Sequence, residues 1–542
     1  MLKAKLFDGL LLVLWTLLIG FLAYQINGKL IGIDDADIFF VYSKNLALGK
    51  GLLFSEGIPR VEGYTSTLWM LLCSAIFFVG FEKGGIFALT LFIFFLTHLL
   101  GFKTIERLTF SPKSYFWKIL YIVILTSSCG YCSWTTVTLM DTTLWGALLI
   151  SMNYFLLFDP ENKKEWLLAI LTFCLAPLAR PEALLICPLL LVIILFKNGP
   201  YYFFKKPSIF IPTGFLFSAI SVTAFRIRYF GYPFPNTFYA KVSHSLFQNL
   251  KSGGKYFLDY LFSNSLMSLS FLLAIWCGLA FCLSKNNRKQ KHLGEQPLGL
   301  VSLMVLSALS LPIFSGGDHF NLYRFYQPIY PIIAIQIVLL ICKAVPSLNS
   351  VSVLNRAVGL IWLLCLSTRD NWLEISRRGS PIKYEFFLSE LGRGVGNSLN
   401  ELFSKQQSDL PAVGVIAAGG VAMTYRGTIY DLMGLNNSYI SHFSEVRTGP
   451  KNHAAFQKEA FFNLPIDILL IPTSPDDEFI QEALKGLLED PVFKSTWTYG
   501  SIHLLDQPSK NQRAFYRRSF VDKLNNYGEY SFEVIHTTNL SS

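Results

Sequence analysis

The hydrophobic positions of the chain gather into long uninterrupted runs that short polar stretches separate. Runs long enough to cross a bilayer, or nearly so, centre on residues 8–26, 65–80, 86–101, 117–133, 142–158, 166–179, 183–196, 208–228, 265–283, 299–315, 327–345 and 353–367. No run of this kind follows Thr368. The pattern predicts a polytopic α-helical membrane protein with a transmembrane domain over residues 1–368.

The region from 369 to 542 has a different pattern. Short apolar runs suited to strands begin at residues 412, 466 and 501, and helical stretches such as "DDEFIQEALKGLLED" alternate with them. Two glycine-containing segments, "AAGGVAMTYRG" and "YDLMGLNN", match no phosphate-binding or dinucleotide-binding motif, so we interpret them as structural turns. The pattern predicts a small C-terminal α/β domain.

The distribution of charged residues predicts which loops lie in the cytoplasm. Residues 1–368 hold 29 Lys and Arg against 16 Asp and Glu, while the later residues hold 17 against 20, so the excess base lies on membrane loops and does not indicate nucleic acid. The loops 102–118, 197–207 and 284–298 are basic and should stay in the cytoplasm. The C-terminal domain then lies on the far side, and Lys3 and Lys5 before the first run indicate an uncleaved signal anchor.

The basic loops set a limit on the number of crossings. With loop 102–118 in the cytoplasm, runs 65–80 and 86–101 cannot both cross fully, because "GFEKGG" between them would then be cytoplasmic as well. We therefore expect about 11 transmembrane helices, with residues 65–80 forming a short re-entrant or surface-lying helix beside a cavity.

The nine cysteines all lie at or before Cys365, scattered among apolar segments. They imply neither a disulfide framework nor a zinc site. Cys129 and Cys132 have CxxC spacing, but within an apolar stretch we expect them to pack.

The first polar loop, residues 27–64, opens with the adjacent carboxylates Asp34 and Asp35. Both could cap the helix that the spacing after them predicts. Capping needs one acceptor, however, and the same loop also holds Lys44, Glu62 and Tyr64. Neighbouring acids push their pKa values apart, so one can take a proton while the other holds a metal or a partner charge. We favour a functional pair.

Further polar residues are expected on the same far side of the membrane. They are Asp141, Arg180, Glu182, Asn236, Tyr239, Lys241, Asp318, His319 and Arg324. Cations beside glycines suit a phosphate, and aromatic rings suit a sugar or a lipid tail. Each has a plainer interpretation: an ion pair for Arg180 with Glu182, an interfacial belt for the aromatic residues, and a hydrogen-bonded structural role for His319.

These residues carry a resemblance. The segment "IDDADIFFVYSKNLALGKGLLFSEGIPRVEGYTSTLW" resembles the first extracytoplasmic loop of bacterial membrane glycosyltransferases of the GT-C fold, notably the arabinofuranosyltransferase-like branch. "GYPFPNTFYAK", "GGDHFNLYRF", "YDLMGLNN" and "KNHAAF" resemble that branch in the same order, so the likeness spans nearly the whole chain. It implies a fold and a reaction class, and no particular sugar.

The resemblance implies an enzyme of the bacterial cytoplasmic (inner) membrane. Such enzymes transfer a hexosyl or pentosyl group from a polyprenyl-phosphate carrier to a glycan, lipid or protein acceptor on the extracytoplasmic side, usually with inversion. Asp34 and Asp35 would be the general base and the acceptor or metal contact. No cofactor is certain; a divalent cation such as Mg²⁺ or Mn²⁺, if used, would bind one of these two acids.

The resemblance also implies roles for the other polar residues. Arg180, Lys241 and Arg324 would neutralise the departing lipid phosphate, and Asp318 with His319 would position sugar or acceptor. The chain departs from the family at Leu139, Met140 and Asp141, where many relatives carry Gly-Leu-Glu, which leaves the role of Asp141 open.

Two other functions compete with the transferase. A transporter or flippase of a lipid-linked or phosphorylated substrate should show internal repeats and ionisable residues at mid-membrane depth, and no repeat is visible. A scaffold that only presents the C-terminal domain would have no need of Asp34 and Asp35. The gathering of charged residues at one face favours the enzyme.

Overall fold

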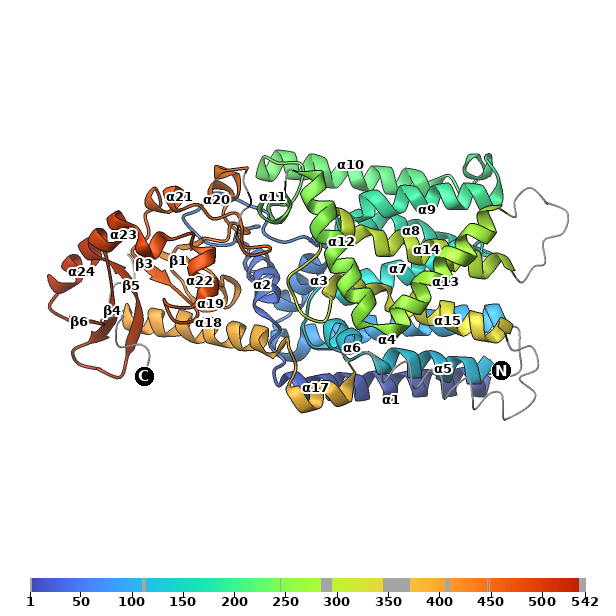
Figure 1. Ribbon diagram of the computed structural model, residues 1–542, viewed down its shortest axis with the longest axis horizontal. Helices are drawn as coiled ribbons and strands as arrows, with labels where there is room; N and C mark the ends of the chain where they lie inside the picture. The colour runs from blue at the N-terminus through green and yellow to red at the C-terminus, as the bar shows by residue number, and fades with distance from the viewer. Residues whose placement is uncertain are drawn as a thin grey trace. The chain divides into compact units, whose positions relative to one another are not determined.

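The computed structural model describes residues 2–109, 114–243, 245–283, 295–344, 371–404, 410–445, 447 and 449–535. Every predicted apolar run within these ranges lies in helix. The run at 353–367 and most of the basic loop 284–298 lie outside the described residues. The chain is mostly helical, with a small sheet near its C-terminus (Figure 1).

Six helices in the described part of the chain are long and apolar enough to cross a membrane. They belong to α1 (Leu2–Asn27), α4 (Glu82–Thr109), α10 (Phe210–Phe230), α13 (Ser265–Leu283), α14 (Glu295–Phe314) and the continuous η3 (Arg324–Ile329) and α15 (Tyr330–Ala344). A bent pair, α5 (Ser114–Ser127) and α6 (Cys129–Thr136), would make a seventh; its two helices meet at 85°. By length and composition these helices are compatible with a multi-pass membrane protein, and the expected count of about 11 crossings is not shown.

Three further apolar helices in the described residues are shorter. They are α3 (Thr67–Phe78), α7 (Thr142–Leu157) and α9 (Ala183–Asn198), and α8 (Lys163–Ala179) lies between the last two in the chain. At 1.5 Å per residue, the 12 residues of α3 reach roughly 18 Å, well short of the bilayer core of about 30 Å. The expectation that residues 65–80 form a short helix agrees with this length.

The chain divides into two compact units. The bundle unit comprises Met1–Leu30, Lys83–Val222 and Leu246–Lys383, and the sheet unit comprises Ile31–Glu82, Thr223–Ser245 and Tyr384–Ser542. The sheet unit therefore includes the first polar loop, α3 and the end of α10, whereas the sequence placed one boundary at residue 368. A domain assembled from three separate segments leaves no single composition break for a sequence pattern to detect.

The bundle unit packs its helices around buried apolar side chains, with a few polar groups paired inside. The amide of Gln336 on α15 accepts a hydrogen bond from Ser270 of α13 and donates one to Ser302 of α14 at 3.0 Å. Cys129 and Cys132 are buried on α6, as expected for packing residues. Polar side chains that bond to each other hold membrane helices together where lipid offers no partner.

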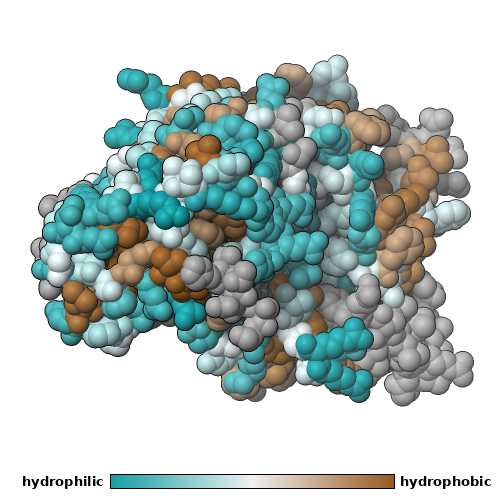
Figure 2. Space-filling view, turned by 60° about the vertical axis from the view of Figure 1, so that its left-hand side comes forward, coloured by the Kyte–Doolittle hydropathy of each residue, from teal (hydrophilic) through white to brown (hydrophobic). Residues whose placement is uncertain are grey.

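The sheet unit contains six strands in the order β2-β1-β3-β5-β4-β6. These are β1 (Val413–Val415), β2 (Ile429–Asp431), β3 (Ile468–Leu470), β4 (Trp497–Leu504), β5 (Asn511–Arg517) and β6 (Tyr530–Val534). β1 pairs in parallel with β2 and β3, and the pairs of β5 with β3 and of β4 with β5 and β6 are antiparallel. Strands β1, β3 and β4 confirm the strands expected near residues 412, 466 and 501. The part of the protein that carries the sheet is mostly hydrophilic on the face in Figure 2.

Helices accompany the sheet within this unit. The later ones are α18 (Lys383–Leu402), α19 (Gly419–Thr424), α20 (Ser438–Phe443), α21 (Lys458–Phe462), α22 (Glu478–Ala483), α23 (Pro491–Thr496) and α24 (Arg518–Asn525). The earlier segments contribute α2 (Asp34–Ala47), α3 and α11 (Asn236–Lys241), together with the end of α10. The first polar loop is thus folded into the same unit as the sheet.

Glycines let α2, α18 and α19 approach closely. A Cβ on Gly419 would lie 1.9 Å from the backbone oxygen of Asp34, and one on Gly420 would lie 2.5 Å from that of Ser389. One on Gly392 of α18 would lie 2.9 Å from the backbone nitrogen of Val421. The segment 417–427, expected to be a turn, instead contains the whole of the short helix α19, whose first two glycines pack closely against α2 and α18.

Candidate functional site

The two adjacent acids head α2, yet neither caps it. The position before the helix is Ile33, and no side chain caps the helix start. The Asp34 carboxylate instead accepts hydrogen bonds from the backbone amides of Gly419 at 3.1 Å and Gly420 at 2.7 Å, at the start of α19. Asp34 is 8% exposed, and burial raises its pKa to about 7 despite these two hydrogen bonds. Asp34 therefore attaches α2 to α19.

A third acid of the same segment, Asp37, was missed from the sequence. It is fully buried, forms an ion pair with Arg393 of α18 and accepts a hydrogen bond from the Ser389 hydroxyl at 2.6 Å. Asp37 lies three residues after Asp34, so both acids lie on one face of α2. That spacing was the available signal for an acidic face used in packing.

Asp35 lies outside this face. Its side chain is 20% exposed, and Oδ2 lies 3.7 Å from Nζ of Lys241, whose side chain is also 20% exposed. Lys241 is the last residue of α11, so the contact joins the first polar loop to the "GYPFPNTFYAK" segment. Of the two acids, Asp35 is the one that a ligand can reach and that has a cationic neighbour.

Glu62, Tyr64 and Asn236 are buried in the sheet unit. Glu62 accepts two hydrogen bonds from the guanidinium of Arg226, at 2.8 and 3.1 Å. The Asn236 amide donates to the backbone oxygens of Gly434 and Leu435, at 2.7 and 2.9 Å. Glu62, Tyr64 and Asn236 are 3%, 1% and 3% exposed, so these three predicted binding residues lie inside the protein.

The "YDLMGLNN" segment forms the other half of this buried polar network. Asp431 accepts from the backbone of Met433 and from both the backbone and the side chain of Asn436, each at 2.9 Å. Oδ1 of Asn436 lies 3.2 Å from the hydroxyl of Tyr42 on α2. A Cβ on Gly63 would lie 1.8 Å from that same Oδ1. The first-loop segment, "GYPFPNTFYAK" and "YDLMGLNN" therefore meet in one place, where they hold backbone segments together.

Two other predicted residues of this unit are half-buried. Nζ of Lys44 donates to the backbone oxygen of Met423 at 3.2 Å. The ring of Tyr239 lies 4.5 Å from that of His442, and its backbone oxygen accepts from Arg447. Lys241 is a predicted residue that the structure does bring to Asp35.

The bundle unit holds a second polar cluster. Nε of Arg180 lies 3.1 Å from Oδ2 of Asp141, and Glu182 lies 3.6 Å from the same guanidinium. Asp141 occupies the position before α7 but makes no side-chain cap there. The ion pair between Arg180 and Glu182 that the sequence suggested is present. Asp141, which is 1% exposed, is however the nearer partner of Arg180.

The "GGDHFNLYRF" segment completes this cluster. Asp318 lies 2.7 Å from Nε of Arg324 and 3.4 Å from Nδ1 of His319. The ring of Phe325 lies 5.0 Å from the Arg324 guanidinium and 5.5 Å from that of Arg180. Two arginines therefore share one aromatic ring, and each is also paired with its own carboxylate.

Backbone strain marks this second cluster. Leu139, Leu322 and Tyr323 have φ of 58°, 61° and 50°, in the left-handed region that non-glycine residues seldom occupy. Leu139 lies two residues before Asp141, and Tyr323 directly precedes Arg324. Strained residues persist where the surroundings fix them and tend to occur at functional sites.

A pocket adjoins Arg180 within the bundle unit. It is a narrow crevice with room for about one water molecule, and Arg180 and Glu182 are its charged lining residues. The rest of the lining is apolar or aromatic, and includes Trp145, Leu311 and Phe325. The crevice therefore presents one guanidinium, already paired with the carboxylates of Asp141 and Glu182, on an otherwise apolar wall.

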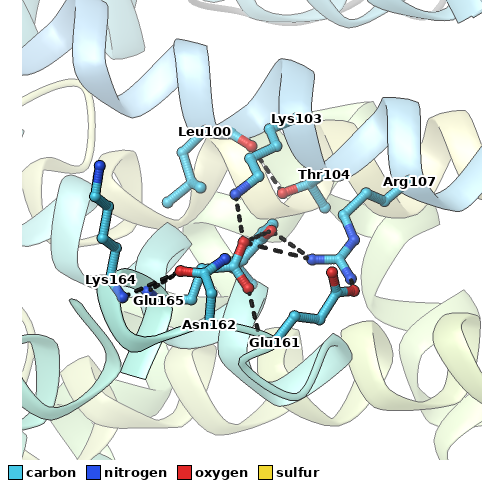
Figure 3. Close-up of polar contacts among 9 residues, drawn as sticks. Leu100, Lys103, Thr104, Arg107, Glu161, Asn162, Lys164 and Glu165 are labelled. Atoms are coloured by element: carbon cyan, nitrogen blue, oxygen red, sulfur yellow. Dashed lines mark hydrogen bonds and ion pairs between the residues drawn. The ribbon is translucent and has the colours of Figure 1, made fainter. Parts of the chain in front are cut away.

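A third ionic group lies where α4 ends and α8 begins (Figure 3). Lys103 lies 2.9 Å from Glu165, Arg107 pairs with Glu161, and Asn162 caps α8 through the amides of residues 164 and 165. Each acid here is paired with a base and the cap is filled, so these contacts fasten two helix ends. We assign this group a structural role.

The expected metal ligands do not suit a divalent cation. Both oxygens of Asp34 accept backbone amides, and the neighbour of Asp35 is an ammonium group. Among the residues that the structure describes, no three His, Cys, Asp or Glu side chains come together to hold an ion. We therefore derive no step through a metal.

Comparison with known proteins gives no relative: no family model, no curated protein and no solved structure matches the chain.

Proposed function

We propose that this protein is an integral membrane glycosyltransferase that uses a polyprenyl-phosphate-linked sugar. The observation that carries the proposal is the buried arginine cluster of the bundle unit, in which Arg180 and Arg324 are each paired with a carboxylate beside the ring of Phe325. Guanidinium groups bind phosphate oxygens, so this cluster is suited to the phosphate of a polyprenyl-phosphate donor. The motif resemblance supports the same reaction class.

Asp35 is the proposed general base. In an inverting transfer, the oxygen of an acceptor hydroxyl bonds to the anomeric carbon while the bond from that carbon to the phosphate oxygen breaks. The phosphate leaves with the bonding electrons, and the hydroxyl proton passes to the Asp35 carboxylate. Asp35 is suited because it is partly exposed, whereas Asp34 is occupied by the amides of Gly419 and Gly420. The ammonium group of Lys241 lies beside this carboxylate, 3.7 Å from Oδ2.

The arginine cluster is assigned to the leaving group. Negative charge develops on the phosphate as the bond breaks, and fixed cations stabilise it without reorganising. Arg180 and Arg324 are held by Asp141, Asp318 and the shared ring of Phe325, so they are oriented before a ligand arrives. Glu182, at the pocket wall, is suited to orient the sugar.

The membrane and the side of the reaction are inferred from the sequence. We place the protein in a bacterial inner membrane, with the C-terminal unit and the reaction on the extracytoplasmic side, because the basic loops belong to the cytoplasm. The acceptor is a glycan, lipid or protein of the cell envelope.

The arginine cluster can be tested by ligand-induced thermal stabilisation of the full chain in lipid nanodiscs. A long-chain polyprenyl phosphate should raise the unfolding temperature, because a ligand that binds only the folded state stabilises it. The neutral polyprenol of the same length should raise it much less. Equal effects of phosphate and alcohol would contradict the role of Arg180, and an effect of neither would contradict the proposed phosphate site.

A further inference from the structure

A helix of the bundle unit carries an apolar stripe that no part of the described protein covers. On α12 (Leu246–Ser263), residues Phe247, Leu250, Leu258 and Phe262 are 76%, 37%, 49% and 84% exposed. Their spacing, together with Gly254 between Leu250 and Leu258, follows steps of three and four residues, which places them on one face of the helix.

The opposite face of α12 is fixed to the bundle. Tyr256 and Tyr260 stack on Tyr326 of η3, with ring centres 5.3 and 4.7 Å apart. Gly253 meets α14 so closely that a Cβ there would lie 2.2 Å from the backbone oxygen of Ile313. The apolar stripe is therefore held outward by packing, and a rotation that buried it would break these contacts.

Charge lies along one edge of the stripe. Lys251 and Lys255 are exposed one turn apart, and the exposed Asp259 follows one turn later. On a helical wheel the two lysines fall beside Phe262, and Asp259 lies farther round. An apolar face with lysines at its border is typical of helices that lie in the surface of a membrane.

The connection to α13 fixes the depth of this helix. Only Asn264 separates α12 from α13, a helix apolar enough to span a membrane, and Oδ1 of Asn264 accepts from the backbone of Met267 to cap it. Figure 1 shows α12 running across the direction of α9, within the same unit. A helix that turns aside where a membrane span begins lies at the boundary of hydrocarbon and headgroups.

We propose that α12 is an in-plane membrane helix that binds anionic phospholipid. Phe247, Leu250, Leu258 and Phe262 insert among the acyl chains at the membrane surface, and Lys251 and Lys255 contact the headgroup phosphates. Because its inner tyrosines stack on η3, which begins at Arg324, lipid binding holds that segment in place. This proposal does not depend on the transferase activity.

The test places the photo-crosslinker benzoylphenylalanine at Phe262 or Phe247 of the full chain. The protein is put in nanodiscs of equal phosphatidylglycerol and phosphatidylcholine, irradiated and analysed by mass spectrometry. We expect lipid adducts at both positions, with the anionic lipid several-fold over-represented, since a lysine near an anionic surface favours it about fivefold, equivalent to about 1 kcal/mol.

The double variant Lys251→Gln with Lys255→Gln should return the adduct ratio to that of the disc. The matched control, Lys163→Gln with Lys164→Gln, removes two exposed lysines from the start of α8 and should leave the ratio unchanged. Adducts to a second protein copy, or no adducts, would overturn the membrane assignment. A ratio unaffected by the α12 variant would overturn the headgroup contact.

Discussion

At the scale of single residues, two neighbouring carboxylates have different surroundings. Asp34 is buried against the amides of Gly419 and Gly420, while Asp35 is partly exposed beside Lys241. The spacing of Asp34 and Asp37 places those two acids on one face of α2 and Asp35 on another, but it does not say which face is buried. The difference arises from α19, which is nearly 400 residues away along the chain and supplies the partners of only one acid.

Asp35→Asn should abolish sugar transfer and leave stability nearly unchanged. The side chain is partly exposed, so losing its charge should change the free energy of unfolding by about 0.5 kcal/mol or less. The unfolding temperature of the full chain in detergent, measured beside transfer in cells, checks both parts. A large fall in unfolding temperature would place Asp35 among the structural residues instead.

Asp34→Asn should act on stability, in a way that depends on pH. The asparagine leaves one of the two α19 amides without an acceptor, which costs about 1–3 kcal/mol at pH 5. The folded-state pKa of Asp34, about 7, lies above the ordinary 3.8, so between these values the folded protein binds more protons than the unfolded one. Its contribution to stability therefore falls as pH rises, by on the order of 4 kcal/mol at most.

The measurement is the unfolding temperature of wild type and Asp34→Asn between pH 4.5 and pH 8 (about the range that a membrane protein tolerates in detergent). At low pH the wild type should unfold at a higher temperature than Asp34→Asn. The difference between the two unfolding temperatures should decrease as the pH rises to about 7. Asp37 and Asp35 lie close enough to raise the pKa of Asp34 further, and both acids are kept in the variant. A gap that widens with pH would contradict the assigned pKa shift.

At the scale of elements, the apolar runs predicted helix positions well. A run of about 20 apolar residues has few alternatives in lipid, so each described run is helical. The break between α5 and α6 was not predicted, because residues 117–133 were treated as one apolar run although Ser127 and Ser128 interrupt it; Ser128 begins α6 by accepting from the amide of Tyr131. β2, β5 and β6 were missed as well: β2 has three residues, and β5 is largely polar.

Gly419→Ala should disrupt the packing of α19 on α2. The new methyl would lie 1.9 Å from the backbone oxygen of Asp34, so the helices must separate. We expect a loss of about 1–3 kcal/mol, visible as a lower unfolding temperature. Gly394→Ala on α18 is the matched control, because nothing lies within 4 Å of its Cβ, and it should be neutral or slightly stabilising. Equal effects of the two would refute close packing at Gly419.

At the scale of the whole molecule, the division into units was the least predictable feature. The sheet unit takes residues from Ile31–Glu82 and Thr223–Ser245, which sequence patterns assign to membrane loops. Such an assembly depends on long-range contacts such as Asn236 with Gly434, and one sequence carries no signal for these pairs. The predicted binding residues accordingly fall into two groups, one in each unit.

Topology gives a prediction at this scale. An epitope tag after Ser542 should be accessible to antibody in intact spheroplasts, because the C-terminal unit is assigned to the extracytoplasmic side. A tag inserted in the basic loop 284–298 should become accessible only after lysis. The opposite result would place the polar clusters on the cytoplasmic side, where a polyprenyl-phosphate donor of this class is not used.

The most direct test of the account is mass spectrometry of envelope glycans from wild-type and deletion strains. The deletion strain is complemented with wild type or Asp35→Asn at equal amounts of membrane protein. We predict that one sugar substituent is missing from the deletion strain, returns with the wild-type gene and stays missing with Asp35→Asn. Glycans identical in wild-type and deletion strains would contradict the proposed transferase, and full restoration by Asp35→Asn would contradict its base.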